Sequence, residues 1–303
     1  MKDRKSKFLV IVIFVFIALL AVQPALAKAD VWGDTGEGFA RGNGAPLCNG
    51  QGATIYVSGG FVVGGPDNGN AYAGVLNGTA GNDVMVAPTK TQYPASNTLN
   101  GFDGDDTMCS SRNSFGDDLY GGNGNDYLKG SNAGDFLAGQ ANDDWMDGGG
   151  GADDLAGGPN NDTVYGSQGQ DNIATDGGND WIDGGHDNDT IDAGSEADTV
   201  YGGGGDDTIY GGWSGDDIYG GAGNDYIEGG GSADNVWGED GDDEIFGDGA
   251  TATDPQNDYL YGGNGDDELT GDAGNDTLDG EGHVAGDTCD GEVEANCEFD
   301  FGP

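Results

Sequence analysis

An aspartate recurs at every ninth position through the middle of this 303-residue chain. Thirteen successive aspartates keep the step of nine, and an apolar residue stands two positions after each of them. Glycines fill most of the four or five positions before each aspartate, so the unit reads G-G-x-G-x-D-x-U-x, where U is apolar. The aspartates are Asp135, Asp144, Asp153, Asp162, Asp171, Asp180, Asp189, Asp198, Asp207, Asp216, Asp225, Asp234 and Asp243. Such a fixed period is typical of folds that stack one small unit many times.

Looser copies of the unit extend in both directions. A copy short by one residue ends at 116–120, and residues 247–257 interrupt the period with six extra residues, which we expect to loop out of the stack. We therefore predict irregular repeats over 78–129 and regular repeats over 130–291. The aspartates of the looser copies are Asp83, Asp106, Asp126, Asp258, Asp267, Asp276 and Asp287.

One unit contains a single short strand. The residues x-U-x alternate polar, apolar and polar, which predicts a strand with U pointing inward. The glycine-rich residues before it predict a turn and no helix. One unit cannot bury its apolar residue alone, but stacked units can build a continuous core. Two units then make one coil, and residues eighteen apart lie about 4.8 Å from each other, as in any sheet. The sequence therefore predicts an all-β solenoid.

This stacking would place the aspartates in two columns, one along each edge. Asp135, Asp153 and Asp171 would belong to one column, and Asp144 and Asp162 to the other. Carboxylates about 5 Å apart repel strongly, so a bare coil should be unstable. The net charge of −47 cannot be balanced by the protein, which has 9 Lys plus Arg against 56 Asp plus Glu. The same charge excludes binding to the phosphate backbone of nucleic acids.

A divalent cation between successive turns would reverse the sign of this interaction. Ca²⁺ accepts six to eight oxygen ligands at about 2.3–2.6 Å from carboxylates and carbonyls, both of which the glycine-rich turns offer. Mg²⁺ demands a stricter octahedron and suits such a turn less well. About twenty copies would hold on the order of twenty ions, or roughly +40 charges. We therefore predict multiple Ca²⁺ ions as the cofactor.

The repeats resemble those of the RTX, or haemolysin-type, calcium-binding proteins. The resemblance covers about residues 78–291 and is clearest in units such as Gly202–Tyr210, GGGGDDTIY. It implies a right-handed parallel β-roll with Ca²⁺ in the turns between coils. It also implies that the motif aspartates named above are side-chain ligands, with turn carbonyls completing the shell. The segments around Cys48 and Cys289 resemble the lead-in and the terminal cap of secreted bacterial proteins of this type.

The first 27 residues have the pattern of a secretory signal peptide. Four basic residues precede an apolar run at 8–22, and Ala25-Leu26-Ala27 forms a small-x-small cleavage pattern. Cleavage is expected after Ala27, with Ala29 as the alternative. An uncleaved anchor is the rival interpretation, but fifteen apolar residues are short for a span of about 20. We therefore predict a secreted protein with no membrane span after cleavage. Residues 28–77 would form a lead-in and cap, and residues 292–303 a C-terminal tail.

Four cysteines stand at 48, 109, 289 and 297. Export favours disulfides, and four thiols allow three pairings. Local pairing, with one bridge at each end of the repeats, is the economical choice. Zinc binding is the rival, but no C-x-x-C pair or nearby His supports it.

Several copies depart from the consensus. Thr175 and Ala193 replace the first glycine, and Ser214-Gly215 shifts a glycine by one. We expect the sites with Ala193, Glu196 and Ser232 to be the weakest, whereas Asn and Asp tolerate left-handed backbone. The replacements of the fourth-position glycine are Asn160, Asp187, Glu196 and Ser232.

Tyr201, Tyr219 and Trp237 stand eighteen residues apart at the end of their units. They predict an outward aromatic column, which either stacks for stability or forms a platform for a sugar or a partner surface.

The sequence favours a secreted, non-enzymatic calcium-binding protein whose repeats fold on binding Ca²⁺. Neither G-x-S-x-G nor H-E-x-x-H occurs, and paired carboxylates are explained by the metal-ligand interpretation. The alternatives are a calcium-dependent adhesin or surface spacer that recognises a cell-surface or polysaccharide partner, and a hydrolase fragment.

Overall fold

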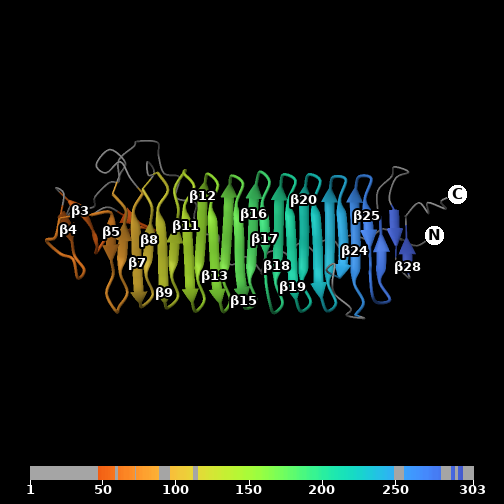
Figure 1. The fold of residues 1–303 in the computed structure, drawn as a ribbon, viewed down its shortest axis with the longest axis horizontal. Coiled ribbons are helices and arrows are strands. Elements are labelled where there is room, and N and C mark those ends of the chain that lie inside the picture. Colours follow the sequence, from red (N-terminus) through yellow and green to blue (C-terminus); the bar gives the residue numbers. More distant parts are fainter. Residues whose placement is uncertain are drawn as a thin grey trace, which may run out of the picture. The chain divides into compact units, whose positions relative to one another are not determined.

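A computed structural model describes residues 47–58, 61–71, 73–88, 96–111, 115–248, 256–280, 288–290 and 293–295. Within these ranges the chain forms β-strands and turns, and it contains no helix. Strands of even number pair with one another, as do strands of odd number, so two parallel twelve-stranded sheets arise from one continuous winding (Figure 1). The predicted all-β class and the parallel coiled architecture are confirmed.

One of the two sheets, the even sheet, consists of even-numbered strands, one from each coil. Its members are β6 (Val84–Val86), β8 (Thr107–Cys109), β10 (Tyr127–Lys129), β12 (Trp145–Gly150), β14 (Thr163–Gln168), β16 (Trp181–His186), β18 (Thr199–Gly204), β20 (Asp217–Ala222), β22 (Asn235–Asp240), β24 (Tyr259–Asn264), β26 (Thr277–Asp279) and β28 (Val293–Ala295).

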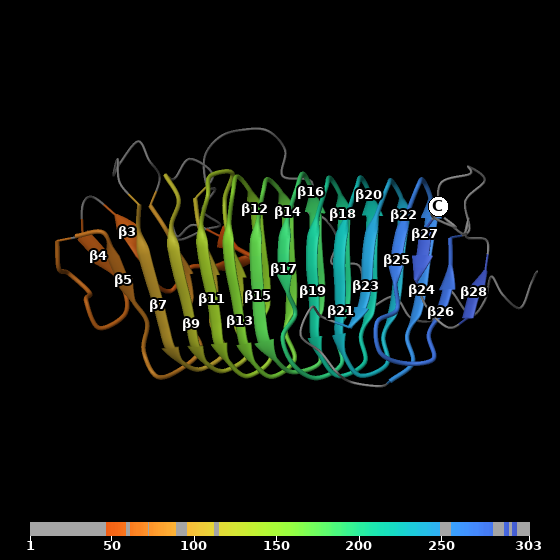
Figure 2. The same cartoon turned by 45° about the vertical axis from the view of Figure 1, so that its right-hand side comes forward.

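The odd sheet supplies the other half of each coil (Figure 2). Its members are β5 (Val75–Asn77), β7 (Thr98–Asp103), β9 (Asp118–Asn123), β11 (Phe136–Ala141), β13 (Asp154–Pro159), β15 (Asn172–Gly177), β17 (Thr190–Asp192), β19 (Thr208–Trp213), β21 (Tyr226–Gly231), β23 (Glu244–Asp248), β25 (Glu268–Thr270) and β27 (Thr288–Asp290).

Most strands are six residues long, twice the length that the x-U-x pattern predicts. In β12, for example, pairing with β14 continues through Gly149 and Gly150. The glycines after the apolar residue keep their backbone amides in the ladder, since pairing needs no side chain. Each strand therefore includes the first half of the next glycine-rich segment, and only the second half turns.

Residues eighteen apart lie in register, as the repeat length predicts. Leu137 pairs with Leu155 and Ile173 with Ile191. Across the insertion the step becomes 24, because Val236 pairs with Leu260. The stack therefore resumes in register after six additional residues.

The core consists of two rows of apolar side chains, one from each sheet. Leu128, Ile182 and Ile209 are each 0% exposed, and one cluster runs from Ile55 to Leu278. Burying one such side chain contributes roughly 1.5–3 kcal/mol. Each coil adds two of them, so the stability of the roll grows with the number of stacked coils.

Two short hairpins precede the first coil. β1 (Leu47–Cys48) pairs with β2 (Gln51–Gly52), and β3 (Tyr56–Ser58) pairs with β4 (Phe61–Val63), both antiparallel. Cys48 of β1 forms a disulfide with Cys109 of β8, with 5.8 Å between their Cα atoms. The N-terminal half of the predicted local pairing is thereby confirmed, and zinc binding by these two thiols is excluded. Cys289 lies in β27, while Cys297 lies outside the described residues.

Candidate metal centre

The motif aspartates line the turns in two columns, as predicted. Each aspartate immediately precedes a strand, so one column lies at the start of the odd strands and the other at the start of the even strands. The odd column contains Asp135, Asp153, Asp171, Asp189, Asp207, Asp225, Asp243 and Asp267. The even column contains Asp83, Asp106, Asp126, Asp144, Asp162, Asp180, Asp198, Asp216, Asp234, Asp258 and Asp276. Asp287 lies outside the described residues.

One hydrogen bond repeats along both columns. The backbone N–H of Asp153 donates to Oδ1 of Asp171 at 2.8 Å, and the N–H of Asp171 donates to Oδ1 of Asp189 at 2.8 Å. In the even column, the N–H of Asp144 donates to Oδ1 of Asp162 at 2.7 Å. Each carboxylate thus ties its own turn to the preceding one through its Oδ1.

The second oxygen of most column carboxylates has no donor. These side chains are nearly inaccessible, with Asp144 3% and Asp189 2% exposed. Leaving a buried acceptor without a donor costs about 1–3 kcal/mol, and more for a charged group. Within the described part of the chain, the buried Oδ2 atoms that accept no hydrogen bond include those of Asp106, Asp126, Asp144, Asp153, Asp162, Asp171, Asp180, Asp189, Asp198, Asp207, Asp216, Asp225, Asp234 and Asp243.

A backbone carbonyl converges on the same place as the Oδ2 atom. A Cβ atom built on Gly184 would lie 2.7 Å from Oδ2 of Asp189 and 2.7 Å from the carbonyl oxygen of Gly202. At Gly202 the corresponding distances to Oδ2 of Asp207 and the Gly220 carbonyl are 2.7 and 2.5 Å. A side chain at Gly184 or Gly202 would collide with two oxygens, which explains why most copies have glycine at this first position. Because glycine has no side chain, a space lined by both oxygens remains at the position where a Cβ would lie. We call this space the cradle.

Burial raises the pKa of many column carboxyls above the ordinary value of 3.8. The pKa of Asp144, Asp153 and Asp234 rises to about 8, although the N–H that each carboxyl accepts lowers it in part. The negative charge of column neighbours raises it further, as Asp126 does for Asp144. Without a counter-ion, these groups are driven toward the neutral form.

The donor set of these turns fits Ca²⁺. Among the described residues, no three His, Cys, Asp or Glu side chains gather at a single point, so an ion here would need carbonyl oxygens beside the carboxylates. Oxygen-only shells of carboxylates and carbonyls are what Ca²⁺ accepts. The column aspartates would hold the ion through Oδ2, and the cradle carbonyls would add to the shell. Bound there, the ion would supply the positive charge that the columns lack.

The imperfect copies keep the backbone of the turn. Asn160, Asp187, Glu196 and Ser232 replace a glycine two positions before an aspartate, and all four have positive φ, from 73° to 93°. The expected shift at Ser214-Gly215 does not occur, because Ser214 itself has a φ of 80° and takes the glycine's place. The strain of a left-handed residue, about 1–3 kcal/mol, is absorbed by stacking against regular turns.

Sequence reasoning missed two members of the odd column. Asp117 belongs to the short copy and accepts the N–H of Asn97 at 2.9 Å, while its own N–H donates to Oδ1 of Asp135. Asn97 occupies the position of an aspartate one coil before Asp117 in the same column, and its side chain carries no charge. The signal for Asp117 was present, since its copy ends in the GDDLY pattern.

A second ladder, of exposed residues, was also missed. The residue directly before each aspartate is often Asn or Asp, and its side chain accepts an N–H from the next turn. Asn161 accepts the N–H of Asn179 at 2.8 Å, and Asp206 accepts the N–H of Asn224 at 2.9 Å. The frequent N-D and D-D dipeptides are the sequence signal for this ladder. It positions the turns from outside and leaves the cradle untouched.

The predicted aromatic column exists and is longer than expected. Tyr201 and Tyr219 stack with ring centroids 4.8 Å apart and planes 8° apart, and Tyr219 and Trp237 with 4.6 Å and 5°. Ring faces that cover one another cannot also cover a sugar, so this geometry favours stabilising stacks. The whole column comprises Tyr127, Trp145, Tyr165, Trp181, Tyr201, Tyr219, Trp237 and Tyr261.

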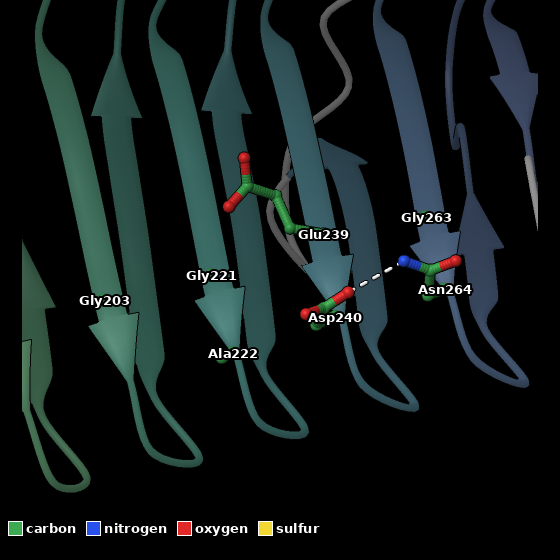
Figure 3. Close-up of a pocket in the computed structure, with 7 residues that line it drawn as sticks. All are labelled: Gly203, Gly221, Ala222, Glu239, Asp240, Gly263 and Asn264. Atoms are coloured by element: carbon green, nitrogen blue, oxygen red, sulfur yellow. Dashed lines mark hydrogen bonds between the residues drawn. The ribbon is translucent and has the colours of Figure 1, made fainter.

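A groove crosses the turns near the C-terminal end of the even sheet (Figure 3). Its polar side chains include Asp240 and Asn264, whose Nδ2 donates to Oδ1 of Asp240 at 2.7 Å. The remaining lining is Gly203, Gly221, Ala222, Glu239 and Gly263. The lining contains no Ser, Cys, Lys or His, and its only titratable side chains are the carboxylates of Glu239 and Asp240.

The fold and the two columns define a parallel β-solenoid with aspartate-lined turns, an arrangement consistent with calcium binding. The family profile of the RTX calcium-binding nonapeptide repeat matches the chain throughout this region, and the chain belongs to that family. The matched residues are 68–87, 95–114, 111–139, 129–164, 165–200, 192–227, 219–250 and 253–282. A comparison with curated proteins finds no match. Repeats of this family are typical of secreted bacterial proteins. No segment in the described ranges forms a helix that could span a membrane.

Proposed function

We propose that this protein is a secreted, non-enzymatic calcium-binding protein whose repeats fold when calcium enters the turns. The observation that carries the proposal is the buried Oδ2 of the column aspartates, which the described part of the protein leaves without a donor. A fold that buries so many bare carboxylate oxygens needs positive charge from outside the chain.

The charges of the columns determine whether calcium favours or opposes folding. Two carboxylates about 5 Å apart repel by about 3 kcal/mol at an effective dielectric constant of 20. Each column places many such pairs in sequence, whereas the apolar core gains only two side chains per coil. Without calcium the repulsion and the desolvation of carboxylates oppose stacking. With calcium, the affinity for the ions becomes folding free energy.

The test is a calcium titration of the chain without its predicted signal peptide, followed by far-ultraviolet circular dichroism and native mass spectrometry. We expect strand signal to appear at about 10⁻⁴–10⁻³ M calcium, the range of extracellular modules. Chelation by EDTA should abolish the signal, and magnesium at equal concentration should restore little of it. An equally ordered chain after complete chelation would refute the proposal.

Secretion is supported by the signal-peptide pattern and by the Cys48–Cys109 disulfide, because disulfides persist mainly in oxidising compartments. Expression in a bacterial host followed by N-terminal sequencing of the exported protein tests this part. A mature chain that begins at Lys28 or Asp30 supports it, and a chain retained with residues 1–27 contradicts it.

The non-enzymatic part of the proposal is supported by the lack of the serine-hydrolase and zinc-protease motifs and by the groove, whose lining has no Ser, Cys, Lys or His. A broad hydrolase screen with the calcium-loaded chain tests it. Turnover that is lost with EDTA but present in calcium would contradict it.

A further inference from the structure

We infer that the turns of Asp83 and Asp135 close without calcium, because a threonine or a serine donates there to the carboxylate oxygen that is bare in the regular turns. The inference rests on the proposed function and identifies, among the predicted ligands, two that hold no ion.

At Asp83 the missing donors come from Thr79. Its backbone N–H donates to Oδ2 of Asp83 at 2.7 Å, and its hydroxyl donates to the same oxygen at 2.8 Å. The carboxylate oxygen that is bare in the regular turns therefore has two donors here. An ion at this oxygen would have to displace both of them.

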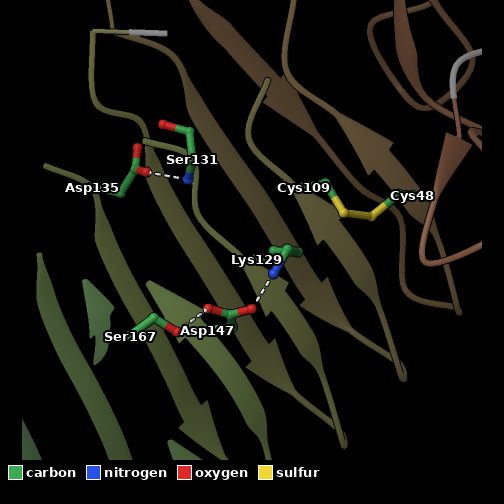
Figure 4. A network of polar contacts seen from close by, with 7 residues as sticks. All are labelled: Cys48, Cys109, Lys129, Ser131, Asp135, Asp147 and Ser167. Atoms are coloured by element: carbon green, nitrogen blue, oxygen red, sulfur yellow. Dashed lines mark hydrogen bonds and ion pairs between the residues drawn. A yellow bond between two sulfur atoms is a disulfide. The ribbon is translucent and has the colours of Figure 1, made fainter. Parts of the chain in front are cut away.

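At Asp135 the donor is the backbone of Ser131, four residues earlier. The N–H of Ser131 donates to Oδ2 of Asp135 at 2.6 Å (Figure 4). Oδ1 already accepts the N–H of Asp117, so both carboxylate oxygens are satisfied.

The backbone conformation explains why Ser131 can do this. Ser167 stands at the same position in the turn of Asp171, but its φ is 81°, as in a regular turn. Its hydroxyl donates outward to Oδ1 of Asp147 at 3.0 Å, and Oδ2 of Asp171 stays bare (Figure 4). Ser131 does not have a positive φ, and neither does Thr79. A negative φ at this position therefore turns the N–H toward the carboxylate.

The turn of Asp180 lies outside this inference. Thr175 occupies its first motif position, where regular turns have glycine, and the Thr175 hydroxyl donates to the carbonyl oxygen of Ala193 at 2.8 Å. Oδ2 of Asp180 nevertheless has no donor in the described structure, as in the regular turns.

Both turns lie in the N-terminal part of the roll. Asp83 lies within the stretch of chain that the Cys48–Cys109 disulfide closes, and Asp135 follows that stretch, next to the ion pair between Lys129 and Asp147.

Native mass spectrometry of the calcium-loaded chain tests the inference, because it resolves each bound ion. The double variant Thr79→Gly and Ser131→Gly should bind two ions more than wild type, and each single variant one more. Ser167→Gly is the matched control, since Ser167 already has the regular backbone, and it should leave the count unchanged. An unchanged count in a double variant with wild-type circular dichroism would overturn the inference.

A second measurement uses the wild type and does not depend on whether a variant folds. Crystals grown with calcium should show anomalous scattering from ions beside regular aspartates such as Asp189 and Asp207. None should lie beside Asp83 or Asp135, and an ion there would overturn the inference. A wild-type chain that binds no calcium at all would instead refute the proposed function.

Discussion

Replacing Asp144 by asparagine should change stability in opposite directions with and without calcium. Asp144 is 3% exposed, its Oδ1 accepts the N–H of Asp126 at 2.7 Å, and its Oδ2 has no donor in the described structure. Asparagine keeps the Oδ1 acceptor and removes the charge. In the calcium-loaded roll the substitution deletes one anionic ligand, whereas in the metal-free roll it deletes an unbalanced buried charge.

The magnitude for the metal-free roll follows from the pKa. Burial raises the pKa of Asp144 to about 8 from 3.8, so at pH 7 the folded chain must keep this carboxyl mostly neutral. Protonating a group that ionises at 3.8 when unfolded costs about 4 kcal/mol at pH 7, at 1.36 kcal/mol per unit. Asparagine avoids this cost, so Asp144→Asn should stabilise the metal-free fold by up to about 4 kcal/mol.

The assay is thermal unfolding followed by circular dichroism, in calcium and in EDTA with trimethylamine N-oxide, an osmolyte that favours compact states. We expect the variant to melt below wild type in calcium and above it in EDTA. The control is Asp143→Asn, which makes the same charge change at the adjacent exposed residue, whose Oδ1 accepts the N–H of Asn161 at 3.1 Å. Asp143→Asn should move both midpoints little. A destabilised Asp144→Asn variant in both conditions would refute the reasoning.

Four further outcomes are expected. Gly184→Ala should remove one calcium ion in native mass spectrometry, because its Cβ would lie 2.7 Å from Oδ2 of Asp189; a full complement of ions would contradict the cradle. Ile209→Ala should destabilise the calcium-loaded roll by about 2–5 kcal/mol in urea unfolding, since Ile209 is fully buried; a change below about 1 kcal/mol would mean that the core does not limit stability. Replacing both Cys48 and Cys109 by serine should cost about 2–5 kcal/mol in the same assay, and a neutral effect would show that the bridge is not needed to hold the first coils. In EDTA, strand signal should grow as the pH falls from about 8 toward 3.8, because carboxyls such as Asp153 have a folded pKa of about 8 and their stabilising protonation is lost as the pH rises; a titration with the opposite slope would contradict the burial of the columns.

Most of the fold follows from the spacing of residues. A step of nine with one apolar residue per unit allows two rows of buried side chains, and the pairing of Leu137 with Leu155 is its direct consequence. The columns also follow, because register places every second aspartate in line. The length of the strands did not follow, since glycines look like turn residues until backbone pairing is considered.

The differences among turns could not be read from the motif. Ser131 and Ser167 occupy the same motif position, yet only Ser131 donates its N–H to the column carboxylate. The two serines differ in the sign of φ, which is positive at Ser167 and not at Ser131, and the residue type alone does not reveal it. Asp117 was overlooked for a different reason, because a one-residue deletion removes its copy from the period while the stack keeps it in the column.

The hydrogen bond along each column points in one direction only. The N–H of Asp153 donates to Asp171, and that of Asp171 to Asp189, so every amide relies on a residue that comes later in the chain. A polypeptide that leaves a secretion pore N-terminus first would therefore emerge with its latest turn always incomplete. Each turn would be completed only when the following eighteen residues arrive outside. During export the turns would therefore form in order from the N-terminus to the C-terminus.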